Sequence, residues 1–227
     1  MVEHRMGRVD DAVVLRHGIV SVSDKRGLAD FAGQILEAAP HLSLLSTGGT
    51  FRALKEALSD SQRVTEISEY TGQPETHGGL VKTLDWRIYL GILGEAHNNR
   101  HIADRERTDA KLFDLIVVNL YPFREAIASA ESDLEQARSN IDIGGPTMIR
   151  AAAKNFPRVA VVCDPADYPH VIDEVRAGGG ALSLSTRFEL ARKAFAHVAD
   201  YDAAIDAYLR ELNPNVAAAT YLNAEEE

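Results

Sequence analysis

Short apolar segments alternate with helical segments along most of this chain, and this alternation limits the possible fold more than any other feature. Residues 19–23 have the pattern of a strand, and residues 27–36 carry apolar side chains at helical spacing. A strand pattern at 41–45 and a helical pattern at 51–58 repeat the unit. Residues 115–118 form a continuous apolar run, which is typical of a strand buried on both faces of a parallel sheet. The sequence therefore predicts a three-layer α/β fold with a mainly parallel central sheet.

Other segments extend this pattern toward both ends of the chain. Further strands are predicted at 64–67 and 158–163, and further helices at 98–110, 165–176 and 183–212. An apolar stretch at residues 12–22, interrupted at His17-Gly18, predicts a β-hairpin or one long strand. We expect one domain over residues 1–227, with a loose lead-in at 1–12 and a C-terminal tail at 213–227.

Composition and charge argue against several classes of function. The net charge of −10 argues against a general affinity for nucleic acids, which depends on basic surface. No apolar run approaches the ~20 residues that cross a bilayer, and the charged N-terminus does not resemble a secretory signal. We therefore expect a cytoplasmic protein without a membrane partner. Cys163 is the single cysteine, so we expect neither a disulfide within the chain nor a cysteine-based metal site.

A polar loop, Ser46-Thr47-Gly48-Gly49-Thr50, lies between a predicted strand and a predicted helix. Hydroxyl groups and unhindered backbone amides at a helix N-terminus can cradle a phosphate, and glycines allow the phosphate to approach closely. A plain tight turn is the competing interpretation of this loop, because the same residues also favour turns.

The segment 141–155, IDIGGPTMIRAAAKN, has the features of a second anion-binding helix start. Pro146 favours a first helical position, and Gly144-Gly145 allows a ligand to approach the N–H groups there. An acidic cap at Asp142 followed by a small-residue face against a sheet is the alternative interpretation. In an unbroken helix, Lys154 lies about 12 Å along the axis from Pro146, at roughly 1.5 Å per residue. A role for Lys154 beside Asp142 therefore requires an irregular helix start or an approach from the side of the helix.

Two more segments have positions that are typical of ligand-binding residues. Residues 69–85 form a long irregular stretch that carries Lys82 and Thr83, and loops of this length usually serve a function. Asn119 and Tyr121 follow the continuous apolar strand. Because ligands bind beyond the carboxyl ends of strands in open α/β sheets, we expect both residues to face a ligand. An ordinary half-buried aromatic is the competing interpretation of Tyr121.

Short motifs occur along the chain in one order: SVSDK (21–25), STGGT (46–50), VKTL (81–84), NLYPF (119–123), IDIGGPTMIRAAAKN (141–155), DPADY (164–168) and KAFAHVADYD (193–202). Together they closely resemble the inosine monophosphate (IMP) cyclohydrolase domain of the bifunctional purine-biosynthesis enzyme. The resemblance covers residues 18–209 and implies a methylglyoxal-synthase-like fold. It implies an enzyme that closes the ring of 5-formamidoimidazole-4-carboxamide ribotide to IMP with loss of water. It also implies a homodimer that needs no metal or redox cofactor. Because the sequence ends soon after the matching stretch, whereas the family's enzyme continues into a formyl-transfer domain, we expect a stand-alone cyclohydrolase.

The family's functional residues can be carried over by position. The resemblance implies catalytic roles for Lys82, Tyr121, Asp142 and Lys154. It implies that a purine ribonucleotide is bound through its phosphate and ribose by Ser23, Asp24, Lys25, Thr47, Gly48, Gly49 and Thr50, with Thr83 also at the substrate. It further implies a hydrogen bond from Asn119 to the substrate and contacts from the amides near Ile143 and Gly144. A lysine or a phenol can donate to the formyl oxyanion, and a carboxylate can take a proton from the amide nitrogen.

One segment departs from the family pattern. The family's GRVKTLHPKVHGGIL is GLVKTLDWRIYLGIL at residues 79–93, so Leu80 replaces an arginine that contacts substrate, and Asp85 and Tyr89 replace histidines. Leucine cannot imitate a guanidinium, and Arg87 aligns with a family lysine. Three interpretations stay open: an active cyclohydrolase with a rebuilt loop, a purine-nucleotide-binding regulatory module without turnover, or a lyase that acts on a small phosphorylated sugar as methylglyoxal synthase does.

Overall fold

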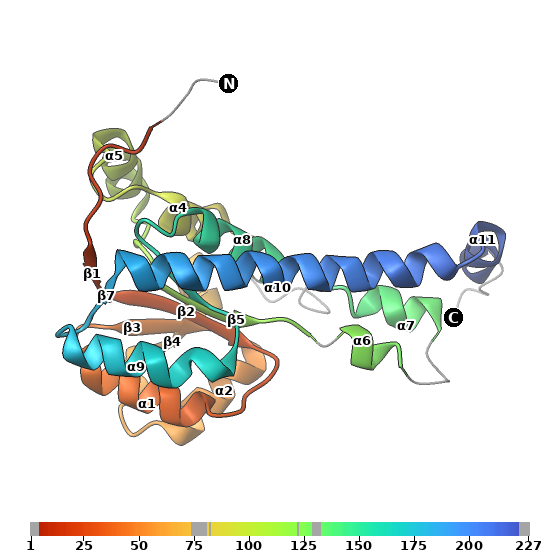
Figure 1. Ribbon diagram of the computed structural model, residues 1–227, viewed down its shortest axis with the longest axis horizontal. Coiled ribbons are helices and arrows are strands. Elements are labelled where there is room, and N and C mark those ends of the chain that lie inside the picture. Colours follow the sequence, from red (N-terminus) through yellow and green to blue (C-terminus); the bar gives the residue numbers. More distant parts are fainter. Residues whose placement is uncertain (1–4, 74–80, 82, 122, 129–132, 223–227) are drawn as a thin grey trace.

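A five-stranded parallel sheet with strand order β4-β3-β2-β5-β6 forms the centre of the molecule (Figure 1). The computed structural model describes residues 5–73, 81, 83–121, 123–128 and 133–222. The strands of the sheet are β2 (His17–Val22), β3 (Ser43–Ser46), β4 (Val64–Glu66), β5 (Leu115–Asn119) and β6 (Ala160–Val162). The mainly parallel sheet predicted from the sequence is therefore confirmed.

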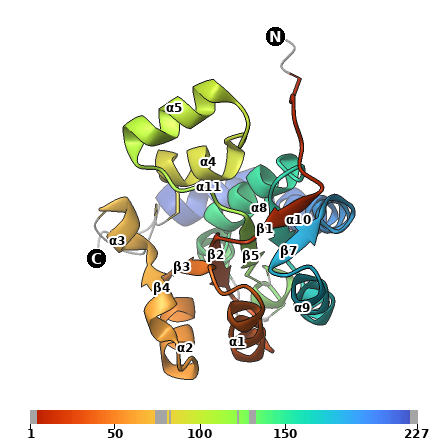
Figure 2. The ribbon, with the colours of Figure 1, turned by 90° about the vertical axis from the view of Figure 1, so that its left-hand side faces the viewer.

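Helices cover both faces of this sheet and make three layers (Figure 1, Figure 2). One face carries α1 (Leu28–Ala38), α2 (Gly48–Ala57) and α9 (Tyr168–Ala177). The other face carries α4 (Trp86–Leu93), α8 (Gly144–Lys154) and α10 (Leu184–Glu211). Successive residues of β5 point to opposite faces of the sheet. Leu115 and Val117 pack in the core with α1 and α9, whereas Ile116 and Val118 pack in the core with α4 and α8. This burial on both faces explains the continuous apolar run in the sequence.

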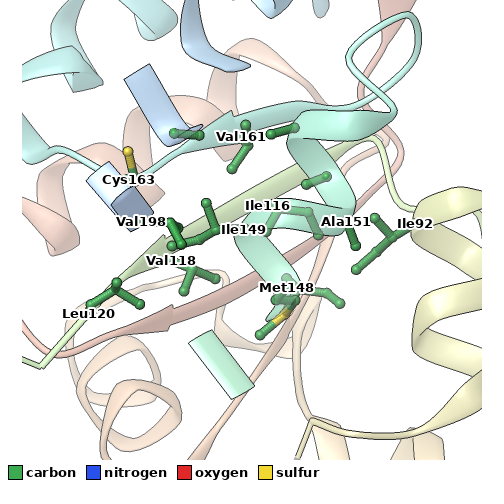
Figure 3. Close-up of a cluster of buried hydrophobic side chains, with 14 of the residues drawn as sticks. Ile92, Ile116, Val118, Leu120, Met148, Ile149, Ala151, Val161, Cys163 and Val198 are labelled. Carbon is green, nitrogen blue, oxygen red and sulfur yellow. The ribbon is translucent and has the colours of Figure 1, made fainter. Parts of the chain in front are cut away.

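The core between the sheet and α8 is built from branched side chains of the strands and smaller side chains of the helix. Ile116, Val118 and Val161 of the sheet lie in one buried cluster with Met148 and Ile149 of α8 (Figure 3). The alanines at 151–153 are buried in the same cluster, and small side chains let α8 lie close to its neighbours. Truncating a buried residue such as Ile149 to alanine typically costs about 2–5 kcal/mol of stability. This packing holds α8 firmly on the sheet, and with it the start of the helix.

The β-hairpin or long strand predicted at residues 12–22 is wrong. Instead, β1 (Ala12–Val14) pairs antiparallel with β7 (Ala181–Ser183), a strand that the sequence pattern does not predict. The side chain of Arg187 supports this pairing, because it is fully buried and donates hydrogen bonds to the backbone carbonyls of Asp10, Asp11, Phe156, Pro157 and Leu182. The N-terminal segment is thus tied to the far end of the chain.

Shorter elements surround this core. They are α3 (Ile67–Thr71), α5 (Asn99–Thr108), α6 (Phe123–Ala126), α7 (Leu134–Ser139), α11 (Pro214–Leu222) and two 3-10 segments, η1 (Ser61–Arg63) and η3 (Pro165–Asp167). The long helix α10 continues past the sheet, and α11 lies at its far end (Figure 1). Helix α11 occupies most of the predicted C-terminal tail, and none of its residues is buried. No helix in the described part of the chain is both long and apolar enough to cross a membrane.

Candidate functional site

The carboxyl ends of β2, β3 and β5 meet at one edge of the sheet, beside a cavity of about 460 Å³. The chain runs outward from β2 to β3 and β4 and then returns to β5 on the other side of β2. Ligands of open α/β sheets bind at such a reversal of strand order. Most of the predicted site residues line this cavity: Ser23, Lys25, Thr47, Gly48, Gly49, Thr50, Thr83, Asn119, Tyr121, Asp142, Ile143 and Gly144. Its volume is in the usual range of small-molecule sites.

Two helices begin at this cavity. Helix α2 starts at Gly48, and Thr47 at its N-cap position makes no side-chain cap bond. The Thr47 hydroxyl instead lies 2.8 Å from the Ser21 hydroxyl, so the N–H groups of the first turn of α2 have no side-chain acceptor from that residue. A Cβ at Gly49 would meet no heavy atom within 4 Å, which leaves room for a ligand. Helix α8 begins on the other side of the cavity at Gly144. Both starts present partial positive charge to an anion.

The Thr50 hydroxyl is already used inside the protein. It accepts a hydrogen bond from the Val22 N–H at 3.1 Å and donates one to the Val22 carbonyl at 3.0 Å. Thr50 is also 4% exposed, so its hydroxyl joins the first turn of α2 to the end of β2. Among the described residues that line this cavity, Lys25 is the one lysine or arginine. An anion in this cavity would therefore meet backbone amides and Lys25 rather than the Thr50 hydroxyl.

The side chain of Asn119 fastens the loop that follows β2 to the end of β5. Its Oδ1 accepts hydrogen bonds from the backbone N–H groups of Ser23 at 2.7 Å and Asp24 at 2.9 Å. Its Nδ2 donates to the Asp24 carbonyl at 2.9 Å. The sequence predicted a hydrogen bond from Asn119 to a substrate, whereas in this geometry its amide oxygen binds the backbone of Ser23 and Asp24. Asn119 acts here as a positioning residue for the loop.

Asp142 lies two residues before α8, and its side chain accepts a hydrogen bond from the first turn of that helix. Its Oδ1 accepts a hydrogen bond from the Gly145 N–H at 3.0 Å, and its own backbone N–H donates to the Tyr201 hydroxyl at 2.7 Å. Burial raises the pKa of the Asp142 carboxyl, although hydrogen bonds from the Gly145 and Gly144 amides lower the pKa in part. A carboxylate with a raised pKa is a better proton acceptor than an ordinary exposed one. Asp142 is therefore the strongest candidate for a general base in the cavity.

Close contacts explain the two glycines that start α8. A Cβ at Gly144 would lie 2.6 Å from Thr83 Oγ1, and a Cβ at Gly145 would lie 2.7 Å from Leu120 Cδ2 and collide with the Asp142 carboxylate. These glycines are thus required by the chain's own side chains, in addition to any ligand. The sequence interpretation of Asp142 as an acidic cap and its interpretation as a site residue are compatible, because the capped carboxylate also lines the cavity.

Two tyrosines near Asp142 were not predicted as site residues. The Tyr89 hydroxyl is buried without a hydrogen-bond partner among the described residues, and burial together with the charge of Asp142 raises its pKa to about 12. The Tyr201 hydroxyl accepts the Asp142 N–H. The sequence offers only weak signals for them: Tyr89 stands at a family histidine position, and Tyr201 shares a four-residue spacing with Lys193 and His197, which indicates a helix face.

Three predicted site residues are not placed in the cavity. The Asp24 carboxylate binds the Arg26 guanidinium at 2.6 Å and lines a neighbouring cavity instead. Lys154 is exposed at the last position of α8, and the helix is unbroken from Gly144, so Lys154 lies about 15 Å along the axis from the start. An irregular helix start, one of the two conditions set for a role beside Asp142, is not found in α8, whereas the other, an approach from the side of the helix, stays a prediction. Lys82 lies outside the described residues.

The replaced family positions around α4 serve its structure. Asp85 is 3% exposed and caps α4, because its side chain accepts a hydrogen bond from the Arg87 N–H at 2.8 Å. The Arg87 guanidinium lies over the rings of Tyr70 and Trp86 and donates to the Thr71 carbonyl. None of these side chains is among the cavity-lining residues. Arg87 therefore does not substitute for the arginine that Leu80 replaces.

Comparisons with known proteins match both halves of the chain. A family model described as "MGS-like domain" matches residues 27–147, and one described as "AICARFT/IMPCHase bienzyme" matches residues 152–227. The "Bifunctional purine biosynthesis protein PurH" of Neisseria meningitidis serogroup A is 46% identical over 206 residues, which cover 91% of this chain and 38% of that protein. PurH of Acidithiobacillus ferrooxidans is 46% identical over 201 residues, covering 88% of this chain and 38% of that protein. The chain thus spans well under half the length of these relatives.

Among solved structures, the crystal structure of ForH is similar to this chain with a TM-score of 0.73 and 32% sequence identity. The similarity covers 85% of this chain and 97% of the ForH chain. The similar region therefore includes nearly the whole of that protein as well as most of this one.

Proposed function

Because this chain belongs to the family of MGS-like domains and is homologous to the IMP cyclohydrolase part of PurH, we propose that it closes the ring of 5-formamidoimidazole-4-carboxamide ribotide to give IMP and water. The observation that carries the proposal is the cavity at the strand ends, which has the uncapped start of α2 for an anion and the half-buried Asp142 carboxylate for proton transfer. A phosphorylated substrate with two reacting groups needs both features in one place.

In this proposal, the nucleotide phosphate binds at the start of α2. The uncapped first turn, the open space at Gly49 and the Lys25 side chain all favour a dianion there. The imidazole part of the ribotide then extends toward Tyr121, after the end of β5, and Asp142, before the start of α8, which line the same cavity. This orientation brings the reacting groups of the ribotide to the carboxylate.

Ring closure requires one new carbon–nitrogen bond and the loss of the formyl oxygen. The carboxamide nitrogen attacks the formyl carbon, and Asp142 takes a proton from that nitrogen. Tyr121 is 58% exposed and lines the cavity, and its hydroxyl donates a hydrogen bond to the developing oxyanion. The oxygen then leaves as water: one of its two protons comes from the carboxamide nitrogen by way of Asp142, and the other comes from the formamido nitrogen, which loses its proton as the C=N bond forms. Because both reactants are on one molecule, holding them in the attacking conformation supplies much of the acceleration.

A purine-nucleotide-binding regulatory module is the second candidate function. Two observations favour it: Leu80 stands where the family has an arginine, and Lys154 is exposed and outside the cavity lining. The phosphate-binding features at α2 do not depend on either residue. Such a module would bind IMP but form none.

The direct test is incubation of the pure protein with the formylated ribotide and chromatographic measurement of IMP. We expect turnover, and we expect Asp142→Asn to lower the rate by about a hundredfold or more, the usual scale for an acid–base group. Lys82→Ala should have an effect of similar size. Asp173→Asn is the matched control, because Asp173 is exposed on α9, outside the cavity. Binding of IMP without turnover supports the regulatory module, and the absence of both refutes both candidates.

The homodimer implied by the family resemblance is part of this proposal. Sedimentation velocity would measure the mass of the particle in solution. A mass of two chains agrees with the proposal, and a mass of one chain at micromolar concentration contradicts it.

A further inference from the structure

A second cavity lies at the opposite edge of the sheet, where β2 and β5 begin. Its volume is about 470 Å³, and it lies between the N-terminal segment with β1, the connection from α4 to α5, and the residues that precede β5. Figure 2 views the molecule from this side, with β1 and α5 toward the viewer. The lining residues are Asp10, Ala12, Val13, Val14, Arg16, His17, Ala96, Arg105, Lys111, Leu112, Asp114 and Arg158. The strands separate this cavity from the one described above by about 17 Å, at roughly 3.3 Å per residue over β2.

Cationic side chains outnumber carboxylates around this second cavity. Arg16, Arg105, Lys111 and Arg158 are the lining residues with permanent positive charge, against the carboxylates of Asp10 and Asp114. This excess stands out in a chain whose net charge is −10. A concave surface with one sign of charge concentrates ions of the other sign.

The two carboxylates already have partners within the protein. Asp114 binds the Arg158 guanidinium at 3.0 Å and accepts hydrogen bonds from the backbone N–H groups of Arg16 at 2.9 Å and His17 at 3.2 Å. Asp10 contacts the His97 ring at 2.6 Å and the Arg8 guanidinium at 3.1 Å. Among the described residues, neither of these two carboxylates forms an ion pair with Arg105 or Lys111, so both cations can accept an anion as a partner.

The cationic groups also repel one another. Burial lowers the pKa of Arg158, and the charge of Arg105 adds to this effect while Asp114 opposes it, so that the pKa is about 10. Burial lowers the pKa of His17, and the charges of Lys111 and Arg16 add to this effect. Arg105 Nε is buried without a hydrogen-bond partner among the described residues. A buried donor of this kind gains a bond when an acceptor enters.

We propose that this second cavity binds the phosphate group of a small phosphorylated molecule, with Arg105 and Lys111 as its principal ligands. The volume exceeds what a phosphate alone would fill, and the apolar lining residues Val13, Val14 and Leu112 suit the carbon part of a phosphate ester. The proposal does not rest on the cyclohydrolase activity, because none of these residues lines the cavity at the strand ends.

The test is a titration followed by amide NMR spectra of the full chain at constant ionic strength, with inorganic phosphate and ribose 5-phosphate as separate probes. We expect saturable shifts of the Ala96 and Leu112 amides, with tighter binding of the ester than of phosphate. Equal binding of the two probes would mean that free phosphate is the ligand, and still supports the site. Absence of saturable shifts at these amides, or shifts reproduced by chloride alone, overturns the proposal.

Paired variants separate this site from the other cavity. The double variant Arg105→Gln, Lys111→Gln should bind the probes with at least tenfold lower affinity, as measured by the titration of the Ala96 amide shift. Arg107→Gln is the matched control, because Arg107 lies on the same helix α5, pairs with Asp104 and does not line the cavity. If the double variant fails to fold, Lys111→Gln alone is used, since the Lys111 side chain is exposed. An affinity unchanged in the charge-removing variant overturns the proposal, whatever the cyclohydrolase assay shows.

Discussion

Replacing Asn119 with leucine tests whether the cavity at the strand ends depends on the fastened Ser23–Lys25 loop. Asn119 is 8% exposed and makes two accepted hydrogen bonds and one donated hydrogen bond to the backbone of Ser23 and Asp24. Each such bond contributes about 0.5–1.5 kcal/mol net. Because the loop amides can reach water once released, we expect Asn119→Leu to lower the free energy of unfolding by about 2 kcal/mol, toward the lower end of the summed range.

Binding should fall together with stability, because Lys25 loses its position. Urea unfolding gives the stability change, and calorimetric titration with IMP gives an affinity that we expect to fall at least tenfold. Asn119→Asp is the informative partner variant: it keeps the oxygen that accepts both hydrogen bonds and replaces the Nδ2 donor to the Asp24 carbonyl. It should therefore lose no more than about 1 kcal/mol of stability. A loss below about 0.5 kcal/mol in the leucine variant, or equal losses in both variants, would refute this account of the loop.

Three further predictions follow from single positions. Gly49→Ala should raise stability by up to about 1 kcal/mol in urea unfolding, because it improves helix propensity in open space, yet weaken IMP binding by filling the cavity. Arg187→Met should cost about 3 kcal/mol or more, because it leaves buried carbonyls without donors, and hydrogen exchange should then increase at β1. The folded-state pKa of Asp142 is raised, so the stability that its protonated form contributes is present below pH ~3.9 and lost as the pH rises through the folded value. Asp142→Asn should remove this fall in stability, and the wild-type ring-closure rate should rise with pH over the same range.

The sheet and its helices could be predicted from local patterns, whereas the β1–β7 pairing could not. Apolar runs such as 115–118 report burial on both faces of a strand, and this signal lies within a few residues. The MGS-like domain match and the five-stranded parallel sheet confirm the predicted fold class. By contrast, β1 and β7 have three residues each and lie far apart in the sequence. Their pairing depends on Arg187, whose buried guanidinium no periodicity reveals.

The candidate site shows the same division between local and distant information. The polar residues after β2, β3 and β5 could be brought together in advance, because the carboxyl ends of parallel strands share one edge. The internal bonds of Thr50 and Asn119 could not be foreseen, since each joins segments far apart in the sequence. Lys154 is not among the cavity-lining residues, because it lies at the last position of an unbroken α8 and the cavity lies at the first. Helix geometry alone predicts this separation.

The rebuilt segment around α4 bears on the choice between the two candidate functions. Asp85 caps α4, the Arg87 guanidinium lies over aromatic rings, and the Tyr89 hydroxyl is buried and close enough to Asp142 for the charge of that residue to affect its pKa. These three positions therefore contribute packing in this chain, where the family has ionisable side chains that differ in charge or shape. If the chain is active, Asp142 and its neighbours in the cavity must transfer the protons, and Asp142→Asn should therefore lower the rate of ring closure strongly. If it is a regulatory module, the same packing explains how α4 stays in place after its chemical role is lost, and Asp142→Asn should alter nucleotide affinity alone.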